Sequence, residues 1–367
     1  MQVRIDPAPM PGEDTFPLVS VIVPVRNEAR NIRRCVPALL SQTYPHLEVI
    51  VVDDRSTDTS PVILDEMLQE NQRESGKAPL RVLHGEDLPP AWAGKPHALH
   101  QGAAIAQGEW LCFVDADTFA APELIASTWS AACRLEADLL SILTDQELGS
   151  FWERVILPLV FTALSVGFPA SRVNDPTRPD AIANGQFILI RRPVYYAVGG
   201  HQAVRLRIDE DKALAEHVKG AGYRLLLADG RRLARTRMYT SLVEIWEGWT
   251  KNIFVGLRDR LWLLLLGAIT GLMGALALPL WLALSLVWLA GGGGLVAAIC
   301  LAQAMLVWVY LLFNRVQACL AFRISPWYAL TLPLGALIFT AMMIASTLKV
   351  ITGRGVTWKG RTYSGTA

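Results

Sequence analysis

The sequence predicts an α/β fold with a doubly wound, mostly parallel sheet, followed by an α-helical membrane region. Two observations predict the sheet: short β-branched runs alternate with helical patterns as far as about residue 255, and several of those runs end in acidic residues. A third observation predicts the membrane region. Hydrophobic residues make up 52% of the 367 residues, the mean hydropathy is +0.32, and the apolar excess is concentrated after Arg260.

The predicted soluble part follows a polar, proline-rich extension, residues 1–16, which lacks the apolar stretch of a signal peptide. We therefore expect this part to remain in the cytoplasm. Four apolar runs are typical of buried strands: Leu18–Val25, Leu47–Val52, Leu80–Leu83 and Trp110–Val114. Helical patterns lie between them, at Asn31–Leu40, Ser60–Gln69 and His97–Ala106. Such sheets bind ligands beyond the carboxyl ends of their strands, so we expect the site where strands end in acidic residues.

Two uncharged stretches, Leu261–Phe313 and Tyr328–Thr347, predict membrane-spanning helices, because a span needs roughly 20 apolar residues. Within the region 258–350 we predict spans at about 261–283, 295–313 and 328–348, with Gly291–Gly294 as a turn and 351–367 as a cytoplasmic tail. Basic residues on both sides of the first two spans place those ends in the cytoplasm. A third complete span would carry the basic tail outside, so the last segment either crosses or re-enters.

A further apolar stretch, 151–169, lies inside the predicted soluble domain of 17–257 and is interrupted by Pro158. A membrane crossing here would place the two halves of the site on opposite faces of the membrane. We therefore interpret it as an interfacial or core helix.

Composition and motifs exclude several other classes of protein. The formal net charge of +1 gives no indication of a nucleic-acid partner, and the five cysteines lack metal-type spacing. The six histidines show no ligand spacing; His201 is interpreted as structural, with a place near the acceptor as the alternative. The sequence contains no Gly-x-x-x-x-Gly-Lys-Ser/Thr loop and no Gly-x-Ser-x-Gly elbow, which argues against nucleotide hydrolases and serine hydrolases.

Three acidic clusters carry the predicted chemistry. Asp53-Asp54 ends the second strand, where a carboxylate can bind a nucleobase or ribose, or alternatively cap a turn. Asp115-Ala116-Asp117 ends the fourth, where two carboxylates can hold Mg²⁺ or Mn²⁺ on a diphosphate. Asp209–Asp211 opens a helix at Ala213–Lys219, where one carboxylate can be a general base or simply a partner of the helix dipole.

The order of these clusters resembles glycosyltransferase family 2, whose catalytic domain has the Rossmann-like GT-A fold. The resemblance covers nearly all of the chain. It rests on six segments: VSVIVPVRNE (Val19–Glu28), VVDDRSTD (Val51–Asp58), WAGKPHAL (Trp92–Leu99), FVDADT (Phe113–Thr118), NGQFILIRR (Asn184–Arg192) and DEDKALAEHVK (Asp209–Lys219). The segments Arg235–Leu257 and Val356–Tyr363 resemble a membrane-bound bacterial subgroup that includes carotenoid and other lipid glycosyltransferases.

The resemblance implies a role for each matching residue. Asp211 matches the catalytic base of an inverting reaction, with Glu210 as the less favoured choice, and Asp117 matches the metal ligand. The donor nucleotide-sugar would contact Asp54 at the uracil, Asp115 at the ribose, and further Pro24, Asn27, Glu28, Asp53 and Lys95. Asn184, Gly185 and Gln186 would line the donor-sugar pocket.

One departure from the family concerns the Gln-x-x-Arg-Trp motif of its processive polysaccharide synthases, which is absent. The equivalent region carries Trp246, Trp249 and Lys251, which could contact a sugar or acceptor, although tryptophans beside a span are also ordinary interfacial anchors. The missing motif and the small number of spans argue against a polymer-extruding channel.

The sequence therefore predicts transfer from a UDP-sugar, of the glucose or N-acetylglucosamine type, to a hydroxylated membrane lipid such as a carotenoid, hopanoid or glycolipid. It predicts Mn²⁺ or Mg²⁺ as cofactor and a multi-pass protein of the bacterial inner membrane with its catalytic domain in the cytoplasm. The alternatives are transfer to polyprenyl phosphate, or a non-catalytic component that binds a nucleotide sugar. Neither the sugar nor the oligomeric state is predicted.

Overall fold

The computed structural model describes residues 3–8, 16–73, 78–257, 261–352, 356–358 and 361–363. Parts of the predicted extension and tail, and the flanking Arg258 and Arg260, lie outside the described residues. The chain forms two compact units, Met1–Glu147 with Phe168–Met238, and Leu148–Gly167 with Tyr239–Ala367. The domain bounds of 17–257 and 258–350 stay a prediction.

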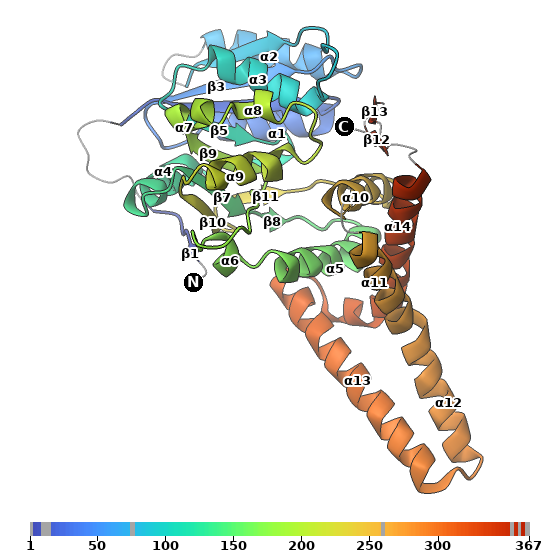
Figure 1. The fold of residues 1–367 in the computed structure, drawn as a ribbon. Coiled ribbons are helices and arrows are strands. Elements are labelled where there is room, and N and C mark those ends of the chain that lie inside the picture. The colour runs from blue at the N-terminus through green and yellow to red at the C-terminus, as the bar shows by residue number, and fades with distance from the viewer. Residues whose placement is uncertain are drawn as a thin grey trace. The chain divides into compact units, whose positions relative to one another are not determined.

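An eight-stranded sheet forms the centre of the first unit (Figure 1). Its order is β1 (Val3–Arg4), β10 (Leu225–Asp229), β7 (Leu139–Leu143), β9 (Phe187–Arg191), β5 (Trp110–Val114), β2 (Val19–Val25), β3 (Leu47–Asp53) and β4 (Leu80–His84). Every strand pairs in parallel except β9, which is antiparallel to both β5 and β7. The predicted mostly parallel sheet is confirmed, and all four predicted strands lie in it.

Helices cover both faces of this sheet because successive strand residues point to opposite sides. The helices of this unit are α1 (Ala29–Leu40), α2 (Ser60–Arg73), α3 (Gly94–Ile105), α4 (Leu124–Arg134), α6 (Ala170–Val173), α7 (Arg192–Ala197), α8 (Gly200–Ala203) and α9 (Glu210–Gly220). Val21 and Val23 of β2 belong to one apolar core, with α1, α2 and α4, whereas Ile22 belongs to a second core, with α3, α7 and α9.

A small second sheet lies in the same unit. It consists of β6 (Thr118–Ala120), β11 (Ala234–Thr236) and β8 (Asp145–Gln146), with β11 in the middle. Strand β6 follows directly after Asp117, and β8 follows β7 after a single residue, Thr144. This sheet therefore connects the loop after β5 to the end of β7.

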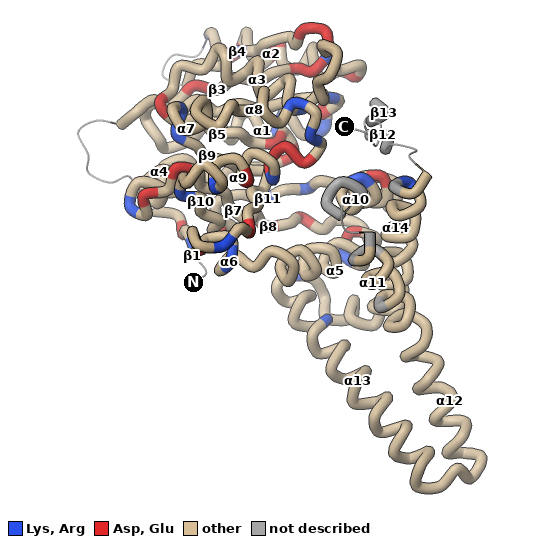
Figure 2. The backbone as a smooth tube through the Cα atoms, in the orientation of Figure 1, with Lys and Arg blue, Asp and Glu red and all other residues tan. Residues whose placement is uncertain are grey.

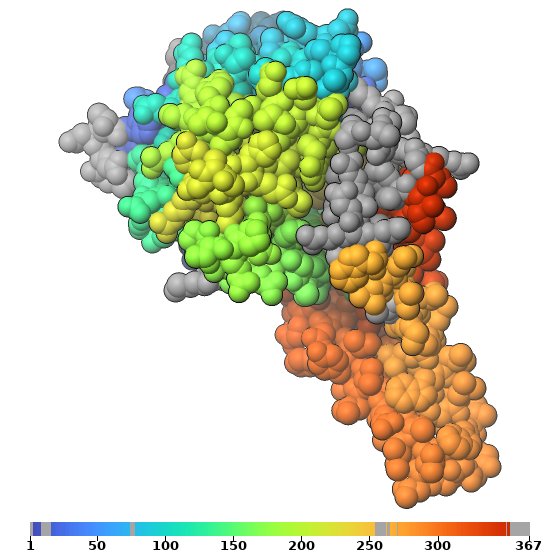
Figure 3. All heavy atoms as spheres, viewed as in Figure 1, coloured from blue at the N-terminus to red at the C-terminus, as the bar shows by residue number. Residues whose placement is uncertain are grey.

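The second unit is mainly helical. Its elements are α5 (Phe151–Gly167), α10 (Leu242–Leu257), α11 (Leu261–Leu272), the π-helix η2 (Met273–Ala277), α12 (Leu278–Ala290), α13 (Gly294–Ala321), the 3₁₀-helix η3 (Pro326–Thr331), α14 (Leu332–Thr352), β12 (Val356–Trp358) and β13 (Arg361–Tyr363). Figure 2 shows almost no charge along α12 and α13, and Figure 3 shows their side chains at the surface.

Four helices among the described residues are long and apolar enough to cross a membrane, judged by length and composition: Phe151–Val173, Leu265–Ala290, Gly294–Ala321 and Pro326–Lys349. Three of them match the predicted spans. The predicted turn at Gly291–Gly294 is also present, with positive φ angles of 88° at Gly292 and 60° at Gly294.

The helix α5 is mostly buried in its first half, after the exposed Phe151, and is exposed in its second half. Val155 and Ile156 are fully buried, whereas Val166 is 76% exposed. Its long apolar sequence makes it a fourth possible span, so its assignment as an interfacial or core helix stays a prediction.

The helix α13 continues past the predicted end of its span at residue 313 and includes the buried Arg315. The Arg315 Nη2 atom donates hydrogen bonds to the carbonyl oxygens of Arg154 (3.0 Å) and Val155 (2.8 Å) on α5. Because Pro158 has no N–H group, the Arg154 carbonyl lacks its usual helical donor. The guanidinium group supplies that donor, and this explains how a cation lies inside the helical unit.

Candidate active site

Three acidic residues and one lysine meet beyond the carboxyl ends of the central strands. The Lys95 Nζ atom, at the start of α3, lies 2.7 Å from Asp115 Oδ1 after β5 and 2.8 Å from Glu210 Oε1 at the start of α9. Asp211 lines the same small cavity as these three residues. The remaining lining residues are Leu99, Phe113, Val114, Gly185, Ile188 and His201. Segments far apart in the sequence thus form one charged site, as expected for a sheet of this type.

Backbone groups fix the Asp211 carboxylate. The Gly185 N–H group donates to Oδ2 (2.9 Å), and the Lys212 N–H group donates to Oδ1 (2.7 Å). A Cβ atom at Gly185 would lie 2.9 Å from Asp211 Oδ2 and 3.2 Å from Lys95 Nζ. The loop before β9 therefore has to carry glycine here if it is to reach the carboxylate.

Burial and charge change the proton affinities in this cluster. Burial raises the pKa of Glu210 to about 7; Lys95 opposes the increase, and Asp211 adds to it. Burial also raises the pKa of Asp211, against the effects of Lys95 and of the two N–H donors. Burial alone would lower the pKa of Lys95, but Asp115, Glu210 and Asp211 outweigh it and raise that pKa well above its usual value. Lys95 is therefore a permanent cation, and the neighbouring Glu210 and Asp211 hold protons more tightly than usual.

Asp117, the predicted metal ligand, lies in the loop directly after β5. It is half-buried, and its carbonyl oxygen accepts a hydrogen bond from the Arg237 N–H group (3.3 Å). Within the described ranges, no group of three or more His, Cys, Asp and Glu residues could hold a metal ion by itself. An Mg²⁺ or Mn²⁺ ion that is bound by one or two carboxylates and by substrate phosphates needs no such group. The assignment of Asp117 as the ligand of such a metal stays a prediction.

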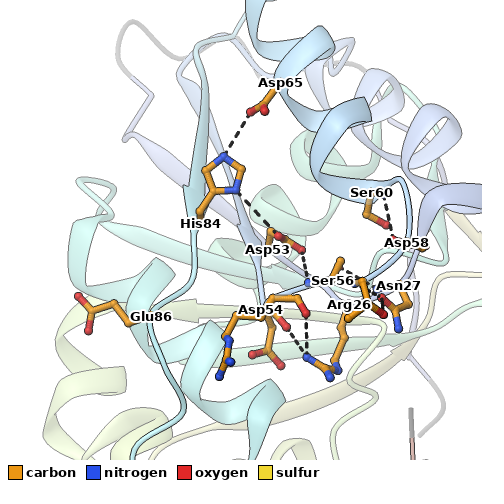
Figure 4. Close-up of polar contacts among 12 residues, drawn as sticks. Arg26, Asn27, Asp53, Asp54, Ser56, Asp58, Ser60, Asp65, His84 and Glu86 are labelled. Atoms are coloured by element: carbon orange, nitrogen blue, oxygen red, sulfur yellow. Dashed lines mark hydrogen bonds and ion pairs between the residues drawn. The ribbon is translucent and has the colours of Figure 1, made fainter. Parts of the chain in front are cut away.

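The predicted nucleoside end of the site lies where β2 and β3 end (Figure 4). The Asp53 Oδ1 atom accepts a hydrogen bond from Ser56 N–H (3.1 Å), and its Oδ2 atom lies 3.9 Å from His84 Nδ1. The Asp54 N–H group donates to Val25 O (2.7 Å), and its side chain is buried. The Asp53 carboxylate is thus engaged in shaping the loop.

Three other predicted donor contacts surround that loop. Pro24 is a partly buried residue of β2. Asn27 adopts a positive φ of 53°, and its Oδ1 atom accepts a hydrogen bond from Thr57 N–H (2.8 Å). Glu28 precedes α1 and accepts a hydrogen bond from Asn31 Nδ2 (2.6 Å). These residues connect the ends of β2 and β3.

The segment Asn184–Gln186 lies before β9, but its side chains face different surroundings. Asn184 and Gly185 are half-buried, whereas Gln186 is only 4% exposed. The Gln186 Oε1 atom accepts hydrogen bonds from the Thr144 hydroxyl and from Asn184 Nδ2 (3.1 Å). Gln186 is not among the residues that line the cavity, and its predicted contact with the sugar stays a prediction.

The tryptophans of the predicted acceptor region belong to α10 in the helical unit. Trp249 is 5% exposed, and its ring packs edge-on against Phe161 with centroids 5.9 Å apart. Trp246 and Lys251 are partly exposed. Their contact with a substrate stays a prediction.

Sequence analysis gave no role to Tyr195, which fixes His201 in the wall of the cavity. The Tyr195 hydroxyl oxygen lies 3.0 Å from His201 Nδ1 and accepts a hydrogen bond from the His201 N–H group (3.1 Å). Burial lowers the pKa of His201 to about 3, and Lys95 and His100 add to the decrease, so the imidazole is neutral. The predicted structural role agrees with this burial. A lone tyrosine in a short helix gives no sequence signal for such a contact.

Comparison with known proteins finds similarity at three levels. The family model described as Glycosyl transferase family 2 matches residues 20–199. A 4,4'-diaponeurosporenoate glycosyltransferase of Staphylococcus aureus (strain MRSA252) is 27% identical over 353 residues, covering 94% of this chain and 88% of that protein. A mannosyltransferase of Pyrobaculum calidifontis, solved in complex with GDP-Man and Mn²⁺, has a TM-score of 0.55 at 20% identity and covers 95% of this chain and 89% of its own. At that identity the likeness shows the fold, which is GT-A-like.

Proposed function

Residues 20–199 form a glycosyl transferase family 2 domain, and from this premise we propose that the protein catalyses inverting, metal-dependent transfer of a sugar from a UDP-sugar to a hydroxylated membrane lipid. The observation that carries the proposal is the cluster of Lys95, Asp115, Glu210 and Asp211 in one cavity. Such a cluster combines a base, a cation and ligand-binding carboxylates, as transfer from a charged donor requires.

Asp211 is the proposed general base. Its carboxylate is held by two backbone donors, and burial raises its pKa, which brings the group closer to neutral pH and makes it a stronger base. It takes the proton of the acceptor hydroxyl while that oxygen forms a bond to the anomeric carbon of the sugar. The bond between this carbon and the diphosphate oxygen breaks on the opposite side, and UDP leaves. A single displacement of this kind inverts the anomeric centre.

Glu210 is bound by the Lys95 side chain, whereas Asp211 is bound by backbone N–H groups. Its carboxylate pairs with Lys95 at 2.8 Å, and burial raises its pKa to about 7. A carboxylate tied to a lysine is a weaker candidate for the base, since proton uptake would cost it that ion pair. We assign to Glu210 the task of holding Lys95 near the donor diphosphate.

The donor would lie across the ends of β5, β2 and β3. Asp117 would bind Mn²⁺ or Mg²⁺, which neutralises charge on the diphosphate as UDP leaves. Asp115 would bind the ribose and Asp54 the uracil, while Asp53, Asn27 and Glu28 maintain the loop around them. Asn184 and Gly185 would border the sugar.

The acceptor proposal rests on the apolar helices and on one relative. Four helices among the described residues could cross a membrane, and the 27% identical relative carries a name that specifies a carotenoid-type acceptor. We place the protein in the bacterial inner membrane, multi-pass, with its catalytic domain in the cytoplasm, where nucleotide sugars are made. Trp246, Trp249 and Lys251 are the proposed acceptor contacts of α10.

Label transfer from a panel of radiolabelled UDP-sugars tests this function. Membranes containing the protein would be incubated with lipid extract and Mn²⁺, and the organic phase would then be analysed. We expect label in the lipid phase with the wild-type protein and none with Asp211→Asn. Label that stays in water with every donor, despite measured donor binding, would exclude a lipid acceptor. A labelled lipid that releases its sugar in mild acid and contains phosphate would instead identify a polyprenyl phosphate acceptor.

A further inference from the structure

A chain of buried side-chain hydrogen bonds joins elements that border the candidate active site. It runs from Thr118 on β6 through Thr236 on β11 and Thr144 at the end of β7 to Gln186 before β9. The Oγ1 atoms of Thr118 and Thr236 are 3.2 Å apart, and those of Thr236 and Thr144 are 3.3 Å apart. The Thr144 hydroxyl donates to Gln186 Oε1. All four residues are 5% exposed or less, so water does not compete for these bonds.

The two ends of this chain lie in the two loops that form the site. Thr118 follows Asp117 directly, and its N–H group donates to the Asp115 carbonyl oxygen (3.0 Å). At the other end, Gln186 Oε1 accepts a hydrogen bond from Asn184 Nδ2 (3.1 Å). Gly185, which donates its N–H to Asp211, lies between these two residues. The chain thus joins the loop of the proposed metal ligand to the loop that holds the proposed base.

The hydrogen bonds of the chain all point in one direction. The Thr144 hydroxyl accepts hydrogen bonds from Gln146 Nε2 (3.0 Å) and from the Thr236 hydroxyl. These two bonds occupy both lone pairs of the Thr144 oxygen, and the Thr144 proton is donated to Gln186. The Thr236 proton goes to Thr144, and Thr236 therefore accepts from Thr118. Each hydroxyl has only one proton, so removal of the Thr236 hydroxyl takes away the acceptor of the buried Thr118 hydroxyl and one of the two donors to Thr144.

We propose that Thr236 and Thr144 are positioning residues that hold the loop of Asp117 and the loop of Gly185 at the separation needed for glycosyl transfer. This inference rests on the proposed function for its consequence in catalysis. Neither threonine lines the cavity, so both act through the loops that they connect. Misplacement of a catalytic group by about 1 Å can reduce a rate on the order of 100-fold, so a small loop displacement is enough to affect transfer.

Substitution of Thr236 tests the proposal. Thr236→Val keeps the shape of the side chain and removes the hydroxyl, whereas Thr236→Ser keeps the hydroxyl. The matched control is Thr128→Val, because Thr128 is also fully buried but bonds only to the carbonyls of Leu124 and Ile125 in its own helix. We expect Thr236→Val to lower kcat on the order of 10- to 100-fold with donor Kd within about twofold of wild type. Thr236→Ser should retain most of the wild-type kcat, and Thr128→Val should leave kcat unchanged.

The hydrogen-exchange rate of the Gly185 amide tests the same proposal without depending on transfer activity. We expect this amide to exchange on the order of 10-fold faster in Thr236→Val than in wild type, and at the wild-type rate in Thr236→Ser and Thr128→Val. An unchanged exchange rate of the Gly185 amide in Thr236→Val would overturn the proposal. A loss of kcat in Thr236→Ser as large as that in Thr236→Val would also overturn it. A wild-type protein without any transfer activity would instead refute the proposed function, while the exchange measurement would still decide the inference.

Discussion

Replacement of Gly185 by alanine provides a sharp test of the site geometry. The added Cβ would lie 2.9 Å from Asp211 Oδ2, 3.2 Å from Lys95 Nζ and 3.4 Å from Asp211 Cβ. Because Asp211 has a short side chain that is bonded at both oxygens, it can yield only if its hydrogen bond to the Gly185 N–H group is lost. A hydrogen bond to a charged group is worth about 1.5–3 kcal/mol. If that stabilisation is lost in the transition state, kcat falls roughly 10- to 150-fold.

The assay is initial-rate transfer at saturating donor, with the melting temperature measured in the same preparation. The control is Gly220→Ala, since Gly220 is the last residue of α9, the helix whose first turn contains Asp211, and a Cβ there would meet nothing within 4 Å. We expect Gly185→Ala to lose activity while its melting temperature stays close to that of Gly220→Ala. Full activity in Gly185→Ala would show that the contact between this loop and Asp211 has no part in transfer.

Three further predictions follow from the charges and helix contacts. Lys95→Met should lower kcat/KM on the order of 100-fold in the transfer assay, because Asp115 and Glu210 lose their shared cation. An unchanged kcat/KM would show that the charge of Lys95 has no part in transfer. Since the pKa of Glu210 rises from an ordinary 4.5 to about 7 on folding, the folded protein holds a proton between these pH values that the unfolded chain lacks. The melting temperature of the wild type should therefore fall as pH rises through this window, and Glu210→Gln should show a smaller fall; parallel curves would contradict the raised pKa. Arg315→Leu should lower the melting temperature in detergent, and Pro158→Ala in that background should recover part of the loss by restoring a helical donor to the Arg154 carbonyl; equal losses in the single and double variants would refute this pairing.

The sequence predicted the elements whose patterns are local. The strands that end at Val25, Asp53 and Val114 are mostly apolar runs that give way to polar residues, so both their type and their approximate ends could be predicted. The pieces of the small sheet, two or three residues each, are too short for any periodicity. They form because strands from distant parts of the chain pair with them, and this cannot be seen in a local window.

The same distinction applies to the site. Asp115 and Asp211 could be predicted because each directly follows or opens a regular element. The contact of Lys95 with Glu210 and the orientation of the Gln186 amide depend on packing between elements, and no spacing in the sequence indicates them. The predicted span ends at residue 313, but α13 continues to Ala321 and includes Arg315, whose guanidinium group donates to the carbonyl oxygens of Arg154 and Val155 on α5.

The most direct test of the central claim measures donor binding and turnover separately in Asp211→Asn and in Glu210→Gln. We expect Asp211→Asn to bind the UDP-sugar with a Kd within about twofold of wild type and to lose turnover on the order of 1,000-fold, since only the base is removed. Glu210→Gln should retain clearly more turnover than Asp211→Asn. Substantial turnover in Asp211→Asn would contradict the assignment of the base, and with it the proposed arrangement of the active site.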